Sequence, residues 1–101
     1  MIYSLSVPGT IEGMEKVRVL EWHGAPGDHF EPGDLIVELE THKAVIEVRA
    51  EQPGVLRERL YDEGAWCPLD TVFAVLSDEV ADPLPATQSD LVAMAARFSI
   101  G

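Results

Sequence analysis

The chain has 101 residues, 47% of them hydrophobic, with 18 Asp and Glu against 7 Lys and Arg. This length and composition are typical of one globular domain and exclude wholesale disorder, and no run approaches the roughly 20 apolar residues that cross a bilayer. The formal net charge of −11 disfavours binding to nucleic acids and to anionic membranes, because their phosphate groups would be repelled.

The first three quarters of the chain predict short strands separated by turns. Apolar residues alternate with polar ones or form short runs, and Gly, Pro and Asp interrupt them about every 8–12 residues, which is typical of an all-β sandwich or barrel. No sustained helical period occurs before residue 77. The expected strands are Ile2–Val7, Val17–Trp22, Leu35–Leu39, Ala44–Val48, Val55–Leu60 and Thr71–Leu76.

A weak internal repeat runs through these predicted strands. A shift of 37 residues places Gly27 on Gly64 and Ile36 on Phe73. The spacing of turn glycines and apolar strands is kept although few residues are identical. Because each half is too small to bury its own apolar face, the repeat predicts two interlocked halves with quasi-two-fold symmetry.

The composition changes near Asp78, which predicts three segments: a domain at 1–78, a Pro/Ala linker at 79–88 and a tail at 89–101. Ser89 suits a helix N-cap. Leu91, Met94, Ala95 and Phe98 follow at helical spacing, so we expect a short amphipathic helix ending at Phe98. Ten residues are too few for a stable isolated helix. We therefore expect residues 89–98 to dock on a partner, on the chain's own sandwich or on a second copy.

Lysine is scarce, and one of the two lysines has a distinctive place. Lys16 and Lys43 are the only ones, and Lys43 lies in Glu40-Thr41-His42-Lys43-Ala44 between two predicted strands. A polar link of this length predicts a tight hairpin with the lysine near its tip. On this pattern alone, an ordinary solvated turn lysine is the better explanation of Lys43.

The stretch around this lysine resembles the lipoyl domains of 2-oxoacid dehydrogenase complexes. That family shows Gly-Asp, a second Gly-Asp near a leucine, Glu-Thr-Asp-Lys-Ala, and a glycine eleven residues beyond the lysine. The matching residues here are Gly27-Asp28, Gly33-Asp34-Leu35, Glu40-Thr41-His42-Lys43-Ala44 and Gly54, together with Val7-Pro8, Trp22, Glu47-Val48 and Ala50. The resemblance covers roughly residues 1–78 and implies a flattened barrel-sandwich of two antiparallel sheets.

The resemblance also implies roles for individual residues. Lys43 matches the lysine that carries lipoate covalently. Glu40, together with the neighbouring Thr41, His42 and Ala44, matches the segment that attachment or partner enzymes recognise. Gly27 matches a glycine in a surface loop near the modified turn, which the resemblance also implies is recognised by attachment or partner enzymes. Glu40 has an alternative explanation as a solvated strand-end charge, but we favour the recognition role for it. For Gly27 we favour a structural role, the supply of a positive φ angle.

Three positions depart from the family pattern. His42 replaces the usual aspartate and removes a negative charge from the hairpin tip, which is expected to affect enzyme recognition. Val17 stands where a glycine is common, and Asp70 stands where the second half often has glycine. The fold is expected to absorb these last two changes, and none of the three affects the lysine.

The resemblance implies a non-catalytic carrier rather than an enzyme. An arm of about twelve bonds would give the lysine-linked cofactor a reach on the order of 15 Å, enough to shuttle acyl groups and reducing equivalents between active sites. The implied partners are a lipoate attachment enzyme, a thiamine-dependent decarboxylase, an acyltransferase and a flavin-dependent dihydrolipoyl dehydrogenase. No Gly-x-Ser-x-Gly elbow marks a hydrolase.

Two alternatives of the same fold remain open. A biotinyl carrier domain of a carboxylase shares the turn lysine, but such domains usually flank it with methionines, whereas His42 and Ala44 flank Lys43 here. An unmodified interaction domain would keep the fold and act through its acidic surface or its tail. Lipoate is the favoured cofactor and biotin the alternative.

Two further classes of site are disfavoured. The histidines at 23, 29 and 42 match no compact zinc pattern, so no metal site is expected. Cys67, the only cysteine, excludes an internal disulfide framework and is expected to pack in the core. Since the N-terminal run resembles no signal peptide, we expect a cytoplasmic protein, or a matrix protein if the source is eukaryotic.

Overall fold

Alternate side chains of each strand point into a shared interior, as the alternation of residue types predicts. In β2 (Lys16–Trp22), Val17 and Val19 are buried and Arg18 between them is exposed. A bulge between Val19 and Glu21 adds one residue before Trp22, which returns that indole to the interior. The computed structural model describes residues 1–9, 15–84 and 91–100.

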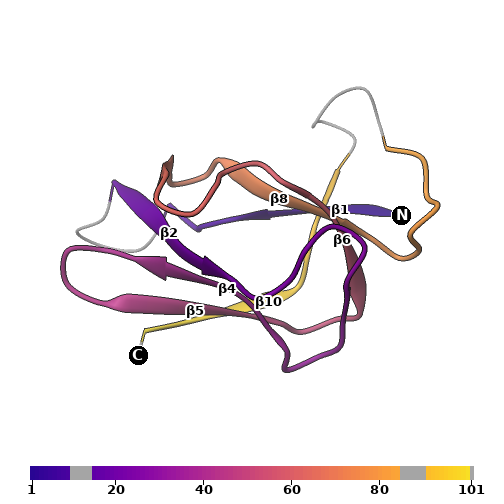
Figure 1. Ribbon diagram of the computed structural model, residues 1–101, viewed down its shortest axis with the longest axis horizontal. Coiled ribbons are helices and arrows are strands. Elements are labelled where there is room, and N and C mark those ends of the chain that lie inside the picture. Colours follow the sequence, from indigo (N-terminus) through magenta and orange to yellow (C-terminus); the bar gives the residue numbers. More distant parts are fainter. Residues whose placement is uncertain (10–14, 85–90, 101) are drawn as a thin grey trace.

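The described residues form two five-stranded sheets that pack face to face (Figure 1). The first sheet has the order β3 (His29–Phe30), β6 (Gly54–Arg59), β8 (Val72–Ser77), β1 (Ile2–Ser6) and β9 (Val92–Ala93). The second has the order β10 (Ala96–Ile100), β5 (Val45–Ala50), β4 (Leu35–Glu40), β2 and β7 (Trp66–Pro68). Neighbouring strands are antiparallel except β1 and β9. The predicted all-β sandwich is confirmed.

The two sheets are related by the predicted quasi-two-fold symmetry. Exchanging β2, β3, β4 and β5 for β6, β7, β8 and β1 converts four adjacent strands of one sheet into four adjacent strands of the other, and leaves the tail strands β9 and β10 outside the symmetry. The hydrogen bonds repeat as well: Gly27 N–H donates to the Leu56 carbonyl and Gly64 N–H donates to the Val19 carbonyl, both at 2.7 Å. Each half therefore supplies a carbonyl that accepts a backbone hydrogen bond from a turn of the other half.

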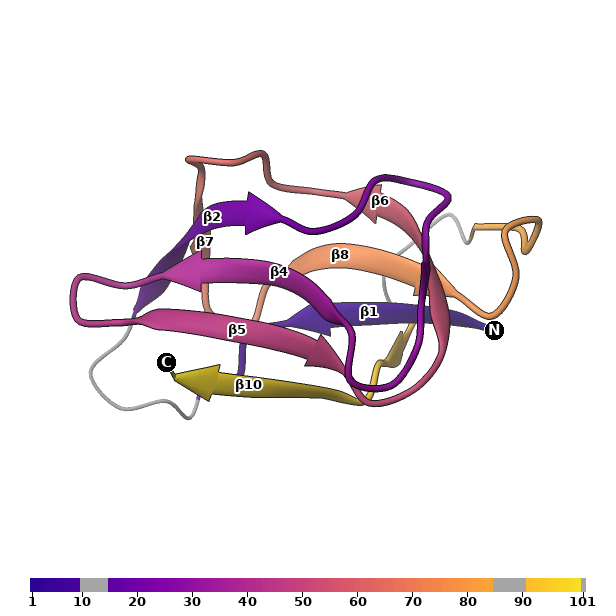
Figure 2. The same ribbon diagram turned by 60° about the horizontal axis from the view of Figure 1, so that its bottom comes forward.

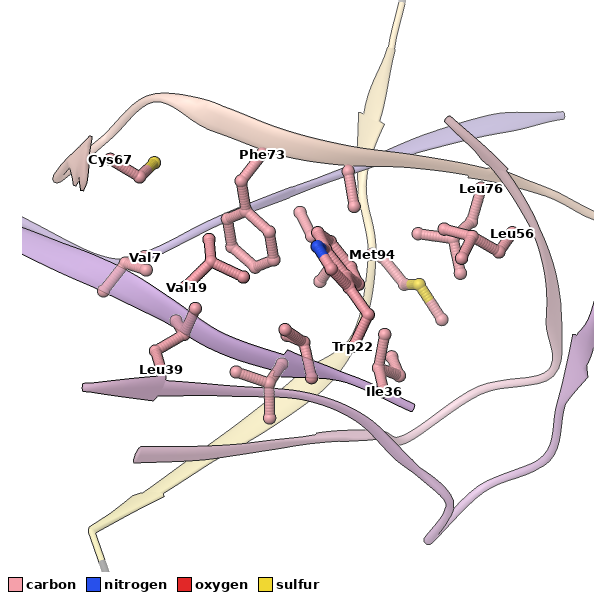
Figure 3. Close-up of a cluster of buried hydrophobic side chains, with 14 of the residues drawn as sticks. Val7, Val19, Trp22, Ile36, Leu39, Leu56, Cys67, Phe73, Leu76 and Met94 are labelled. Carbon is pink, nitrogen blue, oxygen red and sulfur yellow. The ribbon is translucent and has the colours of Figure 1, made fainter. Parts of the chain in front are cut away.

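The core lies between the sheets and combines side chains from both halves (Figure 3). The rings of Trp22 and Phe73 have centroids 6.2 Å apart, and Trp22 donates its indole N–H to the Tyr61 carbonyl at 3.0 Å. Cys67 is fully buried, and burial raises the pKa of its thiol. Its predicted role in core packing is confirmed.

The predicted C-terminal helix is wrong for the residues that the structure describes. Residues 92–93 form β9 and residues 96–100 form β10; Ser89 and the start of the predicted helix lie outside the described residues. The physical reason is tertiary: β1 and β5 offer open sheet edges, and pairing with them satisfies backbone groups that a ten-residue helix would stabilise only marginally. Phe98 and Ile100 also suit strands better than helices.

The tail docks on the chain's own sandwich and joins its two sheets. β9 pairs with β1, and β10 pairs with β5. Between them, Met94 enters the core with only 7% of its surface exposed, and its backbone N–H donates to the Ser4 carbonyl at 2.9 Å. This is one of the three docking modes that the sequence left open.

The beginning of the predicted linker is held against the domain. Arg57 donates to the Asp82 carbonyl at 2.6 Å, and Glu79 N–H donates to the Asp82 carboxylate at 3.2 Å. The chain thus leaves the sandwich through an anchored turn after β8. A bilayer-spanning helix is not found in the described segments.

Candidate functional site

The predicted hairpin is present and projects from one end of the molecule (Figure 2). β4 and β5 pair in antiparallel register, with Glu40 opposite Val45 and Leu39 opposite Ile46. Leu39 and Ile46 are buried in the core, which anchors both strands just before they leave it. The four residues from Thr41 to Ala44 link these strands, one position later than the predicted strand bounds imply, and the hairpin itself is confirmed.

Thr41 closes the turn with both its backbone and its side chain. Its N–H donates to the Ala44 carbonyl at 2.8 Å. Its hydroxyl oxygen accepts from the N–H groups of Lys43 and Ala44 at 3.1 and 3.0 Å and donates to the Ala44 carbonyl at 3.2 Å. Thr41 is buried although it is polar. A threonine in this position therefore holds the backbone of the turn that contains Lys43 in one conformation.

Lys43 is exposed at the tip of this fixed turn, beside the exposed His42 and the half-buried Ala44. Among the described residues, no acceptor lies within hydrogen-bond or ion-pair distance of its amine. An exposed primary amine on a short, rigid turn is accessible to the active site of another enzyme. Its chemistry suits amide formation with an activated carboxyl group.

The other lysine has a different environment, which sequence reasoning did not detect. The Lys16 amine lies 4.9 Å from the centroid of the Trp66 ring, a cation–π contact between β2 and β7. Trp66 is 48% exposed. The two residues are 50 positions apart in the sequence, so only the pairing of β2 with β7 brings them together.

Glu40 lies at the end of β4, directly before the turn. Its carboxylate forms an ion pair with Arg18 at 3.8 Å, across the register of β2 and β4. Both side chains are about half exposed, so the carboxylate remains accessible to a second protein. The sequence did not reveal Arg18 as its partner.

Gly27 does not lie near the turn that bears Lys43, so its expected placement is wrong. β2 runs away from the hairpin, from Arg18 beside Glu40 to Trp22 beside Val37. The connection from β2 to β4, which contains Gly27, lies at the opposite end of the sandwich (Figure 2). Gly27 has φ of +99°, which confirms the structural role that we favoured for it.

The sheet register also assembles one group of metal-type ligands within the described residues. Glu21, His23 and Glu38 have ligand atoms within 4.8 Å of one another. His23 already contacts the Glu38 carboxylate at 2.6 Å. The group is largely exposed, and the His23–Glu38 pair accounts for its geometry without an ion.

The comparisons with known proteins point to one family. The family model for biotin- and lipoyl-attachment domains, described as biotin-requiring enzyme, matches residues 4–76. A dihydrolipoyllysine-residue succinyltransferase component of the 2-oxoglutarate dehydrogenase complex from Bacillus subtilis is 32% identical over 89 residues, covering 85% of this chain and 21% of that protein. Its counterpart from Pseudomonas aeruginosa is 39% identical over 74 residues, or 73% and 17%.

A solved structure agrees with these sequence relatives. The solution structure of the lipoyl domain of the 2-oxoglutarate dehydrogenase complex from Azotobacter vinelandii has a TM-score of 0.66 and 32% identity, and the match covers 75% of this chain and 96% of that one. This chain thus spans almost the whole of a solved lipoyl domain. It spans about a fifth of the Bacillus subtilis and Pseudomonas aeruginosa relatives.

Proposed function

Because this chain belongs to the biotin- and lipoyl-attachment family, and is a lipoyl-type carrier domain like its relatives, we propose that Lys43 is the residue that carries its lipoate. The observation that supports this most directly is the exposed Lys43 amine at the tip of a hairpin whose backbone Thr41 holds in place. This geometry fits covalent attachment of a long chain without any rearrangement of the fold.

The fold would contribute rigidity and the lysine would contribute reach. The strands on both sides of the turn are anchored by buried Leu39 and Ile46, so the attachment point moves little relative to the domain. Lysine plus a lipoyl group would extend on the order of 15 Å. When bound, lipoate would supply a disulfide whose S–S bond opens on reaction with a carbanionic acyl donor, which provides the two electrons, so that one sulfur becomes a thioester and the other a thiol; the dithiol would remain after the acyl group is passed on. A tethered carrier raises the local concentration of that disulfide at each partner active site.

The chain itself has no catalytic role in this proposal. Its named relatives are components of 2-oxoacid dehydrogenase complexes. By analogy, the partners would be a lipoate attachment enzyme, a thiamine-dependent decarboxylase, an acyltransferase and a flavin-dependent dihydrolipoyl dehydrogenase. We place this activity in the cytoplasm, or in the mitochondrial matrix of a eukaryotic source. Glu40, His42 and Ala44 would form the surface that these enzymes recognise around the lysine, on a turn that the buried Thr41 holds in place.

The test is loading of purified protein with lipoate by a lipoate–protein ligase and ATP, followed by intact-mass and peptide mass analysis. Wild type is expected to gain one lipoyl increment on Lys43, and Lys43→Arg is expected to gain none. Lys16→Arg is the matched control, because Lys16 is the other lysine and lies on the same end of the domain; it is expected to load normally.

Three outcomes would contradict the proposal. Loading by a biotin ligase but not by the lipoate ligase would favour the biotinyl carrier. Unmodified Lys43 after treatment with both ligases, in a protein that is folded, would favour the interaction domain. Loading on Lys16 instead of Lys43 would disprove the assignment of the lysine.

A further inference from the structure

Apolar surface is exposed beside the hairpin, on the outer face of the second sheet. Trp66 in β7 is 48% exposed and Leu20 in β2 is 40% exposed. Arg18 is paired with Trp66 on one side and with Glu40 on the other, so these residues form a row that leads from Trp66 to the end of β4. An indole is costly to leave half in water, because it is one of the largest apolar side chains.

The row lies within reach of an arm on Lys43. Adjacent strands are about 4.8 Å apart, so Trp66 and Glu40, separated by β2, are on the order of 10 Å apart. Lys43 follows Glu40 by three residues. An arm on the order of 15 Å therefore spans the distance from Lys43 to the indole, along the face that also carries Lys16.

Charge explains why only a modified lysine would settle there. The Lys16 amine already lies over the indole, and Arg18 is beside it. An unmodified Lys43 ends in a charged ammonium group, which is more stable in water than on an apolar surface. Amide formation removes that charge and replaces it with a saturated chain and a sulfur ring, which gain from contact with an aromatic surface.

We propose that Trp66 and Leu20 form a resting surface on which the lipoyl chain of Lys43 lies between visits to partner enzymes. This inference rests on the proposed function, because it requires a lipoylated Lys43. The occupant is part of this molecule and not a second protein. The opposite flank of the hairpin offers one exposed competitor, Ile100 of β10, which is 66% exposed and pairs with Ile46.

The test uses the two indole N–H signals in 15N–1H spectra of the full chain before and after loading with lipoate. Loading is confirmed by intact mass. The Trp66 signal is expected to shift on loading, and the Trp22 signal is expected to stay, because that indole is buried and bonded to the Tyr61 carbonyl. Backbone signals of residues 16–20 and 64–68 are expected to shift with Trp66.

Two variants separate the resting surface from its competitor. In Trp66→Ala, the loading-induced shifts at residues 16–20 are expected to disappear; in Ile100→Ala, they are expected to persist. A loaded wild type in which the Trp66 signal does not move would overturn the inference and leave the carrier function intact. The same holds if the shifts appear around β10 and vanish in Ile100→Ala. A protein that gains no lipoyl mass would overturn the carrier function and this inference with it.

Discussion

Gly27 and Gly64 occupy equivalent positions in the two halves of the sandwich, 37 residues apart, with φ angles of +99° and +92°. Each donates its N–H at 2.7 Å to a carbonyl of the opposite half, at Leu56 and Val19. The symmetry of the fold thus depends on two turns with positive φ angles, which residues with a Cβ disfavour. The pair also allows a structural role to be distinguished from a functional one, because only Gly27 was expected to take part in enzyme recognition.

Gly27→Ala and Gly64→Ala are expected to destabilise the domain equally, by about 1–2 kcal/mol each, the cost of a left-handed residue with a Cβ. No atom would lie within 4 Å of the added Cβ in either case, so the cost is conformational. Chemical denaturation measures it. Both variants should load lipoate normally when folded. Slower loading of Gly27→Ala alone would restore a recognition role for Gly27.

Thr41→Ala is expected to loosen the hairpin, because it removes a hydroxyl that accepts from two turn N–H groups. The expected loss of stability is about 1 kcal/mol, with a lower rate of lipoate loading on Lys43. Thr41→Ser keeps the hydroxyl and is the matched control. Equal loading rates for the alanine and serine variants would show that the turn does not need this fixation.

Glu40→Gln tests recognition separately from stability. The ion pair with Arg18 is about half exposed, so breaking it should change the free energy of unfolding by less than about 1 kcal/mol. If enzymes read the carboxylate, Glu40→Gln slows loading and Arg18→Gln does not, although both break the same pair. Similar loading in both variants, near the wild-type rate, would make Glu40 an ordinary strand-end charge.

Met94→Ala tests whether the tail stabilises the sandwich. The Met94 side chain is buried in the core between β9 and β10, and its truncation is expected to cost about 2–5 kcal/mol, as in other cores. Val92→Ala, at an exposed position of the same segment, should cost less than about 0.5 kcal/mol. Thermal or urea unfolding measures both. Equal, small effects would mean that the tail is not docked in solution.

The decrease in folding stability at acid pH should depend on Asp78. The Tyr3 hydroxyl donates to its carboxylate at 2.8 Å, and this bond, followed by the Met1 amine, lowers the pKa of Asp78 below its ordinary value of 3.8. A lowered pKa in the folded state stabilises the fold above pH 3.8, and this contribution is lost as the pH falls through the folded-state value.

Melting temperatures measured between pH 7 and pH 3 check this dependence. Tyr3→Phe and Asp78→Asn should each lower the melting temperature near neutral pH. The further decrease of the melting temperature towards pH 3 should be smaller in these variants than in wild type. Asp62→Asn is the control, at an exposed carboxylate outside this group. If both variants lost stability in acid as steeply as wild type, Asp78 would not be a source of the pH dependence.

The pattern of the sequence was sufficient to predict the sandwich and the hairpin that bears Lys43. Both depend on local signals: strand alternation places Val17 and Val19 inside, and a polar link between apolar strands places Lys43 at a tip. The repeat of 37 residues was visible because each half must supply the same turns and the same buried positions.

Only the tertiary structure decided what depends on contacts between distant segments. The pairs Arg18–Glu40 and Lys16–Trp66 follow from strand register, and the place of Gly27 follows from the direction of β2. The tail shows the physical reason most clearly. Its apolar spacing suits a helix, but the open edges of β1 and β5 supply hydrogen bonds that no local pattern of residues 91–100 encodes.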